Sequence, residues 1–151
     1  MSAAVAAASS YTVLLVDDYA RIRQLYRMAL ADEPRLRVVD EAGDGAEAIR
    51  KAKEHQPDLV VLDLSMPRVD GLEALQAIKR ESPRSRVVVL SGFMRDRVSH
   101  VVHELGANAY LEKGIAARAL AKTLLPIAEQ LPASPRPLPR SALEIRVSEL
   151  I

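Results

Sequence analysis

Residues 59–71 read LVVLDLSMPRVDG: four apolar residues, an aspartate, and a short loop that contains a proline and a glycine. A short apolar run bounded by turn residues indicates a strand that is buried on both faces. Asp63 ends this strand, and a buried carboxylate is costly unless a partner compensates its charge. The stretch therefore predicts a central strand of a sheet and a partner for Asp63.

Four further stretches have strand character. Val13–Val16 and Val87–Leu90 are apolar throughout, whereas Arg37–Ala42 and Ala109–Glu112 mix polar and apolar residues. Each of the five stretches is followed by a segment whose apolar residues recur at helical spacing. Five strands that each precede a helix predict a parallel sheet with right-handed crossovers.

The character of each strand predicts its place in the sheet. The first, third and fourth strands are apolar, as expected where helices cover both faces, and the mixed second and fifth strands suit the edges. These features predict a three-layer α/β fold with a doubly wound, five-stranded parallel sheet in the order 2-1-3-4-5. In this order the functional crevice lies at the carboxyl ends of strands 1 and 3.

Two helices carry specific expectations. In the first, Ile22, Leu25 and Ala29 follow i, i+3, i+7 spacing, which predicts that these side chains share the inward face. Pro126 lies in the last helix and lacks a backbone N–H, so we expect it to kink or end that helix by about Leu125. Residues 127–131 could continue as a short turn.

The chain has 151 residues, the size of one domain, and a formal net charge of +1, which does not indicate a nucleic-acid or membrane surface. It has no cysteine, which excludes thiol chemistry and disulfides. Residues 1–10 lack the features of a signal peptide, and no apolar run approaches the roughly 18–20 residues of a spanning helix. We therefore expect a cytoplasmic protein whose residues bind neither nucleic acid nor membrane.

Three carboxylates meet in the predicted crevice. Asp17 and Asp18 follow strand 1, and Asp63 ends strand 3. Clustered carboxylates repel one another unless a cation is present, and oxygen ligands without histidine or cysteine favour Mg²⁺. The alternative is that Asp17 or Asp18 merely caps the helix that starts near Ala20.

Two further side chains follow neighbouring strands. Ser91 ends strand 4 and can donate to an anionic oxygen, and Lys113 follows strand 5 and can pair with a phosphoryl group. Alone, Ser91 would suit a turn and Lys113 a solvated surface. Together with the carboxylates they predict a site for a divalent metal and a small tetrahedral anion, with Asp63 as the candidate nucleophile.

This set of motifs resembles the receiver domain of bacterial two-component response regulators over about residues 11–130. It consists of Asp17-Asp18, Asp63 in LDLSMPRVDG, Ser91-Gly92, and Tyr110 and Lys113 in AYLEKG. The resemblance implies a flavodoxin-like receiver that accepts a phosphoryl group on Asp63 from a histidine kinase or phosphotransfer protein. It implies no enzyme in the usual sense, since a receiver assists only its own phosphorylation and dephosphorylation.

The resemblance also implies roles for the site residues. Asp18, Asp63 and the backbone carbonyl of Ser65 would ligate Mg²⁺, with Asp17 assisting. Ser91 would bond a phosphoryl oxygen, and Lys113 would pair with the phosphoryl charge. Charge neutralisation by Mg²⁺ and lysine suits phosphoryl transfer, in which catalysis is mostly positioning and electrostatics.

A switch follows from the same resemblance. Ser91 would move toward phosphorylated Asp63 and let Tyr110 turn inward, which would change the face formed by the fourth helix, fifth strand and fifth helix. That face would bind a downstream protein partner or a second copy of the chain. The alternative is that Tyr110 merely packs. Lys113 followed by Gly114 resembles the LuxR-type, DNA-binding subgroup.

We expect a disordered tail at 1–10, a receiver domain at 11–131, a linker at 132–140 and a short amphipathic segment at 141–151. The linker sequence PASPRPLPR has four prolines in nine residues, which favours an extended chain. The last segment is too small to fold alone. It either docks on a partner or second copy, or opens an output domain.

Three other functions were considered. A Mg²⁺-dependent phosphohydrolase would need a second acid or base near Asp63 and usually a cap, whereas position 65 is serine and the chain has no cap insertion. An unphosphorylated binding module would require the loss of a site residue, and none is lost. A transcription factor would need a helix-turn-helix that these residues lack, so a receiver fragment of a DNA-binding regulator stays as the alternative.

Overall fold

The computed structural model describes residues 10–64, 66, 70–92, 96–113 and 117–130; of residues 70, 91 and 96–99 it describes the backbone alone. The predicted linker at 132–140 and the segment at 141–151 lie outside these residues, as does all of the predicted tail at 1–10 except Ser10. The domain boundaries placed there stay predictions.

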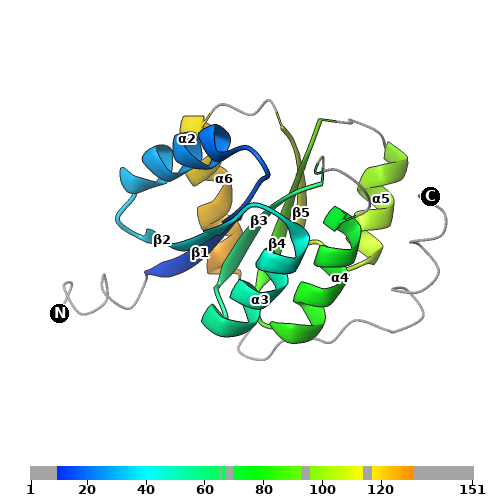
Figure 1. Ribbon diagram of the computed structural model, residues 1–151. Helices are drawn as coiled ribbons and strands as arrows, with labels where there is room; N and C mark the ends of the chain where they lie inside the picture. Colours follow the sequence, from blue (N-terminus) through cyan, green and yellow to red (C-terminus); the bar gives the residue numbers. More distant parts are fainter. Residues whose placement is uncertain (1–9, 65, 67–69, 93–95, 114–116, 131–151) are drawn as a thin grey trace.

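Ten elements alternate between strand and helix along the described chain, as expected (Figure 1). The strands pair in the order β2-β1-β3-β4-β5, and all four neighbouring pairs are parallel. The predicted fold class and strand order are therefore confirmed. The strands are β1 (Tyr11–Val16), β2 (Leu36–Ala42), β3 (Leu59–Asp63), β4 (Arg86–Ser91) and β5 (Ala109–Glu112). The helices are α2 (Ala20–Ala31), α3 (Gly45–His55), α4 (Asp70–Glu81), α5 (Asp96–Glu104) and α6 (Ala117–Glu129).

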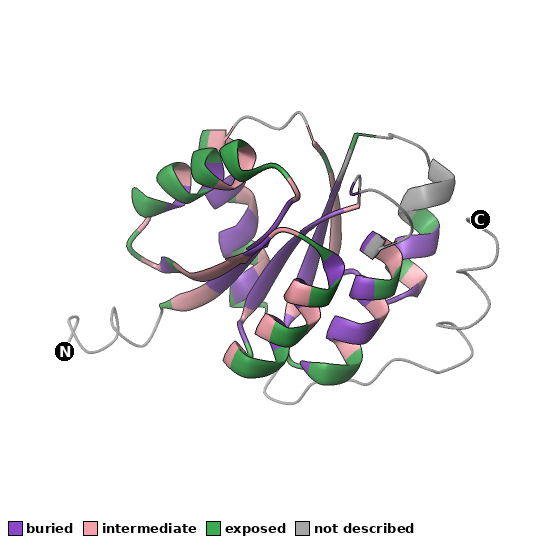
Figure 2. Cartoon of the chain, in the orientation of Figure 1, coloured by how far each residue is buried: buried purple, intermediate pink, exposed green. Residues whose placement is uncertain are grey.

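Helices cover both faces of the sheet in three layers: α2 and α6 on one face, and α3, α4 and α5 on the other (Figure 1). β3 is buried along its whole length, and β1 and β4 are buried over Val13–Val16 and Val87–Leu90 (Figure 2). Alternate residues of β1 belong to the two cores: Val13 and Leu15 pack with α2 and α6, and Leu14 and Val16 with the other three helices. Each fully buried side chain of this size contributes about 1.5–3 kcal/mol to folding.

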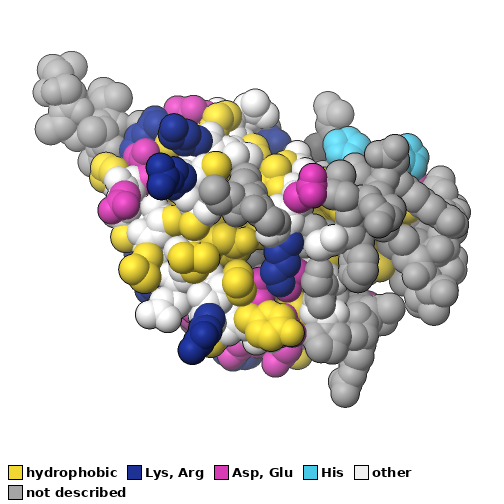
Figure 3. Space-filling view, turned by 90° about the horizontal axis from the view of Figure 1, so that it is seen from above, with side chains coloured by type: hydrophobic (Ala, Val, Ile, Leu, Met, Phe, Trp, Pro, Cys, Tyr) yellow, Lys and Arg dark blue, Asp and Glu magenta, His cyan; other side chains and the backbone are white. Residues whose placement is uncertain are grey.

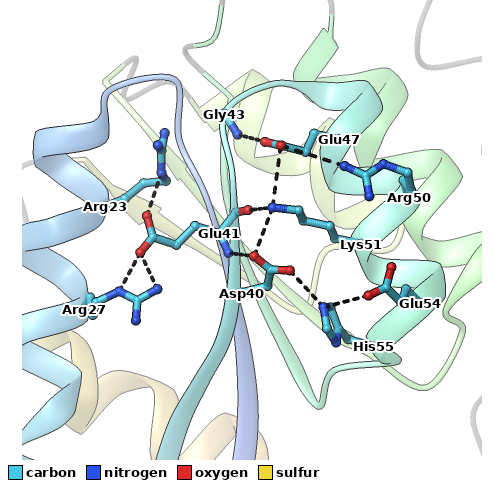
Figure 4. A network of polar contacts seen from close by, with 10 residues as sticks. All are labelled: Arg23, Arg27, Asp40, Glu41, Gly43, Glu47, Arg50, Lys51, Glu54 and His55. Atoms are coloured by element: carbon cyan, nitrogen blue, oxygen red, sulfur yellow. Dashed lines mark hydrogen bonds and ion pairs between the residues drawn. The ribbon is translucent and has the colours of Figure 1, made fainter.

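The edge strand β2 is fixed by charge rather than by burial. Its register with β1 shifts between Val13 and Leu14, whose partners are Val38 and Asp40. Asp40 contacts side chains of α3, and Glu41 contacts side chains of α2, so one strand is bonded to a helix on each face (Figure 4). Burial raises the pKa of Asp40, but hydrogen bonds from Lys51, the Glu41 amide and His55 outweigh it and lower the pKa to about 2.

The expected inward face of α2 was partly wrong. Leu25 is 51% exposed, whereas Tyr26 and Leu30 are buried in the core shared with α6. Successive helical residues lie about 100° apart around the axis, so burial of Tyr26 turns Leu25 toward solvent. The stripe that packs therefore runs through Ile22, Tyr26 and Leu30, a series with i, i+4, i+8 spacing.

Pro126 does not end the last helix by Leu125, because α6 continues to Glu129, as the alternative for residues 127–131 allowed; the expected kink stays a prediction. The missing N–H of proline removes one helical hydrogen bond. Leu125 and Ala128 stay buried through this turn, and two arginines from distant parts of the chain bind its end. Arg35 pairs with Glu129 at 3.1 Å, and Arg86 of β4 donates to the carbonyl oxygen of Gln130 at 2.6 Å.

Candidate functional site

The three predicted carboxylates lie together at the carboxyl ends of neighbouring strands. Asp17 and Asp18 directly follow β1, Asp63 ends β3, and the two strands are hydrogen-bonded neighbours in which Val16 pairs with Leu62. One oxygen from each carboxylate lies within 4.8 Å of the others. Asp17 is 2% exposed and Asp63 is fully buried, so their charges are poorly screened by solvent.

Lys113 brings a positive charge into this cluster from the sheet edge. Its Nζ lies 2.8 Å from Oδ2 of Asp63 and 3.2 Å from Oδ2 of Asp17. Burial lowers the pKa of Lys113, but the contacts with the two carboxylates outweigh it, so the pKa is raised above its usual value. The alternative of a solvated lysine is excluded, because the side chain is 19% exposed and bridges two buried aspartates.

The pKa of Asp17 is also raised. Burial is the main cause and the nearby Asp63 charge adds to it, while the Tyr19 amide and Lys113 act in the opposite direction. The carboxylate accepts a hydrogen bond from the Tyr19 amide at 2.9 Å. Tyr19 is the N-cap residue of α2 and its side chain makes no capping bond, so Asp17 holds the residue before the helix rather than its first turn.

The residues present fit a divalent cation. In the described part of the chain, Asp18 Oδ1 is buried and accepts no hydrogen bond, whereas buried Asp17 Oδ2 has the Lys113 ammonium 3.2 Å away as its partner. Buried polar atoms normally have a partner, and carboxylate oxygens without one suit a hard cation such as Mg²⁺. Ser65, expected to add its carbonyl oxygen, lies outside the described residues.

The structure describes all of Tyr110 but only the backbone of Ser91, the two residues expected to form the switch. Ser91 ends β4, where its backbone pairs with Glu112, but its side chain lies outside what the structure describes. Tyr110 of β5 is half-buried and packs against the core beneath α3, α4 and α5. The proposed movements of Ser91 and Tyr110 therefore stay predictions.

Sequence reasoning missed two residues that support the cluster. Arg23 of α2 donates to the carbonyl oxygen of Asp17 and, through Nε, to Glu41 of β2 at 2.9 Å, so it connects the site to the edge strand. The ring centroid of Tyr19 lies 5.5 Å from Lys113 Nζ. Neither residue belongs to an apolar pattern, and only their proximity to Asp17-Asp18 in the sequence could have indicated a role.

Gly71, at the start of α4, lies close to the residue that follows Asp63. A Cβ at this position would lie 3.0 Å from Cα and Cδ2 of Leu64, the residue that follows Asp63. The start of α4 therefore packs directly on the end of β3. A side chain at position 71 would push this backbone away and shift the aspartate.

Comparison with known proteins agrees with this geometry. A sequence model of the response regulator receiver domain matches residues 13–125. The chain belongs to the response regulator receiver family. As a receiver it has the family's acidic cluster in the described residues, and receivers are signalling switches that function in two-component systems.

The transcriptional regulatory protein LiaR of Bacillus subtilis is 40% identical over 101 residues, which are 67% of this chain and 48% of that protein. A LuxR-family response regulator from Aurantimonas sp. SI85-9A1 is 29% identical, with a TM-score of 0.75 over 95% of this chain and 100% of that one. A chain of the CheX–CheY–BeF3–Mg²⁺ complex from Borrelia burgdorferi is 26% identical, with a TM-score of 0.72 over 78% and 88% of the two chains. The receiver spans about half the length of the curated relatives it matches.

Every helix in the part of the chain that the structure describes falls short of the length and apolar character of a membrane span.

Proposed function

We propose that this receiver is the phosphoacceptor switch of a two-component system, and that a histidine kinase or phosphotransfer protein transfers a phosphoryl group to Asp63. The observation that carries the proposal is the contact of 2.8 Å between Lys113 Nζ and Asp63 Oδ2 inside a cluster of three carboxylates. Asp63 ends the central strand β3, which fixes its backbone, and Lys113 comes from the far side of β4. A nucleophile and its charge partner are thus held in place before the donor arrives.

The phosphoryl transfer exchanges one bond to phosphorus for another. An oxygen of Asp63 forms a bond to phosphorus as the bond between phosphorus and the donor histidine nitrogen breaks, and the imidazole takes up a proton. Lys113 is placed to neutralise charge on the transferred group and to hold it after transfer. The attacking group is the carboxylate of Asp63, and the Lys113 ammonium lies 2.8 Å from its Oδ2.

Asp18, Asp63 and the carbonyl of Ser65 would hold Mg²⁺, with Asp17 assisting. When bound, the ion supplies positive charge against the carboxylates and the phosphoryl oxygens. The buried Asp18 oxygen that accepts no hydrogen bond supports this assignment, as does the Mg²⁺ in the Borrelia burgdorferi complex. Ser91 would donate to a phosphoryl oxygen.

The output would be a changed surface on α5, β5 and α6, with Tyr110 as the side chain that reports the state of Asp63. A downstream protein or a second copy of the receiver would bind there in the cytoplasm. The curated relatives are about twice as long as the matched region, and one is a transcriptional regulator. The alternative output is therefore a DNA-binding domain joined to the receiver, which would act on DNA while the receiver does not.

The test is incubation of the wild-type protein with acetyl phosphate and Mg²⁺, followed by intact-mass measurement. We expect a gain of one phosphoryl group that hydroxylamine removes and that is absent from Asp63→Asn. Asp44→Asn, an exposed aspartate at the start of α3, serves as the control and should be phosphorylated normally. No adduct in the wild type would refute the proposal, and rapid turnover of phosphoesters would favour the phosphohydrolase instead.

A further inference from the structure

We propose that Tyr19 is a positioning residue for Lys113: its ring restrains the lysine side chain so that the ammonium group stays directed at Asp63. The inference rests on the proposed phosphoacceptor function and adds to it a residue outside the motif set. It is carried by the position of the Tyr19 ring, whose centroid lies 5.5 Å from Lys113 Nζ.

The backbone of Tyr19 is fixed from both sides. Its amide donates to the Asp17 carboxylate at 2.9 Å, and its carbonyl oxygen accepts from the amides of Ile22 at 3.1 Å and Arg23 at 3.2 Å. The residue is extended, with φ −98° and ψ 113°, at the point where the chain turns from the carboxylate cluster into α2. Its ring therefore starts from a fixed Cα beside the site.

Packing in the hydrophobic cores does not explain the position of the Tyr19 ring. Tyr19 is 63% exposed, and the residue belongs to neither hydrophobic core. Figure 3, seen from above, shows basic, acidic and hydrophobic side chains close together on this face of the molecule. An aromatic face attracts an ammonium group within about 6 Å of its centroid, so the contact that the ring does make is with Lys113.

Lys113 needs such a restraint. Lysine has four rotatable side-chain bonds, and its ammonium can pair with carboxylates in many geometries. Here it contacts Asp63 at 2.8 Å and Asp17 at 3.2 Å, and both contacts must rearrange when a phosphoryl group is added to Asp63. The Tyr19 ring beside the lysine limits the directions in which Nζ can move. Because the ring is neutral, it does not compete with the carboxylates or the phosphoryl group for the ammonium charge.

The first test uses the metal-free protein without any phosphodonor. NMR signals of the Lys113 ε-methylene group are compared in the wild type, Tyr19→Phe and Tyr19→Leu. Because only an aromatic ring produces a ring-current shift, we expect the Phe variant to keep the wild-type position and the Leu variant to lose it. Identical positions in all three proteins would overturn the inference, whatever the function of the protein.

The second test measures phosphorylation by acetyl phosphate in the presence of Mg²⁺. Tyr19→Leu should lower the maximal rate about two- to fivefold, as expected from the loss of an exposed cation–π contact, and leave the half-saturating donor concentration unchanged. Tyr19→Phe should restore the wild-type rate. Met28→Leu is the matched control, because Met28 lies on α2 with a similar exposure of 62%, and its replacement should have no effect.

A double-mutant comparison separates positioning from direct effects. If Tyr19 acts through Lys113, Tyr19→Leu should cause no further loss in a Lys113→Met background. An undiminished effect in that background, or a change confined to the half-saturating donor concentration, would overturn the inference. A wild type that takes up no phosphoryl group would instead refute the proposed function and leave the NMR comparison to decide the contact.

Discussion

Neutralising Asp17 should stabilise the receiver in the absence of Mg²⁺. Asp17 shares the cluster with Asp18 and Asp63 at separations within 4.8 Å, and its pKa is raised chiefly by burial. At an effective dielectric of about 20, each carboxylate repulsion costs about 3.5 kcal/mol, and the attraction to Lys113 at 3.2 Å returns about 5 kcal/mol. Loss of two repulsions and one attraction leaves a net gain of about 2 kcal/mol for Asp17→Asn.

The sign agrees with proton linkage. A carboxyl whose pKa is higher in the folded state makes the fold less stable as the pH rises from the unfolded pKa of 3.8 through the folded value. At neutral pH the ionised Asp17 therefore costs stability, and an amide of the same shape avoids that cost. Asparagine can still accept the Tyr19 amide bond, and Lys113 keeps its shorter contact with Asp63.

Urea unfolding at pH 7 with EDTA, and again with saturating Mg²⁺, measures this effect. The variant should be more stable in EDTA, and the wild type should gain more from Mg²⁺ because ion binding adds to the stability of the folded state. Asp32→Asn, an exposed aspartate at the end of α2, should change stability by less than about 0.5 kcal/mol. A less stable Asp17→Asn in EDTA would refute the reasoning that repulsion dominates the empty cluster.

Three other predictions concern stability and are each measured by urea unfolding. Glu41→Gln loses ion pairs with two arginines of α2, so stability should fall by about 1 kcal/mol, whereas exposed Glu54→Gln should be neutral; equal effects would contradict the assigned role of β2. The pKa of about 2 for Asp40 means that the wild type loses stability as the pH falls from about 4 to 2. Asp40→Asn should lack this loss, and a steeper acid decline in the variant would argue against it. Burial lowers the pKa of Lys79 to about 8, so its charge costs stability below that pH. Lys79→Met should be more stable at pH 7, with the difference shrinking from pH 8 toward 10.5; a less stable variant would mean that the lost hydrogen bonds to backbone and amide oxygens matter more.

The sheet could be predicted from the sequence because buried strand positions are occupied by apolar residues and exposed ones by polar residues. Strands such as Val13–Val16 and Leu59–Leu62 are covered on both faces, so every position is apolar, and the edge strand β2 carries charges that central strands cannot. The division into edge and central strands then matched the doubly wound order 2-1-3-4-5. The meeting of Asp17, Asp18 and Asp63 required only that order, since neighbouring parallel strands end together.

Features that depend on rotation about a helix or on long side chains could not be predicted in this way. Whether Leu25 or Tyr26 faces the core is decided by about 100° of helix rotation, and both residues are hydrophobic. The end of α6 beyond Pro126 is contacted by two arginines that are distant in sequence, Arg35 and Arg86. The position of the Tyr19 ring over Lys113 depends on two side chains that no sequence period relates.

The contact between Arg86 and the carbonyl of Gln130 has a consequence for how the receiver can be connected to other modules. Arg86 is the first residue of β4 and Ser91 the last, a span of about 17 Å at 3.3 Å per residue. Any polypeptide joined after Gln130 therefore starts at the amino ends of the strands, opposite the carboxylates and beside Arg86, the first residue of β4. A reporter or a heterologous output domain fused there would leave the crevice open to the phosphodonor. The fusion junction would contact the amino end of β4, the strand whose carboxyl end carries Ser91.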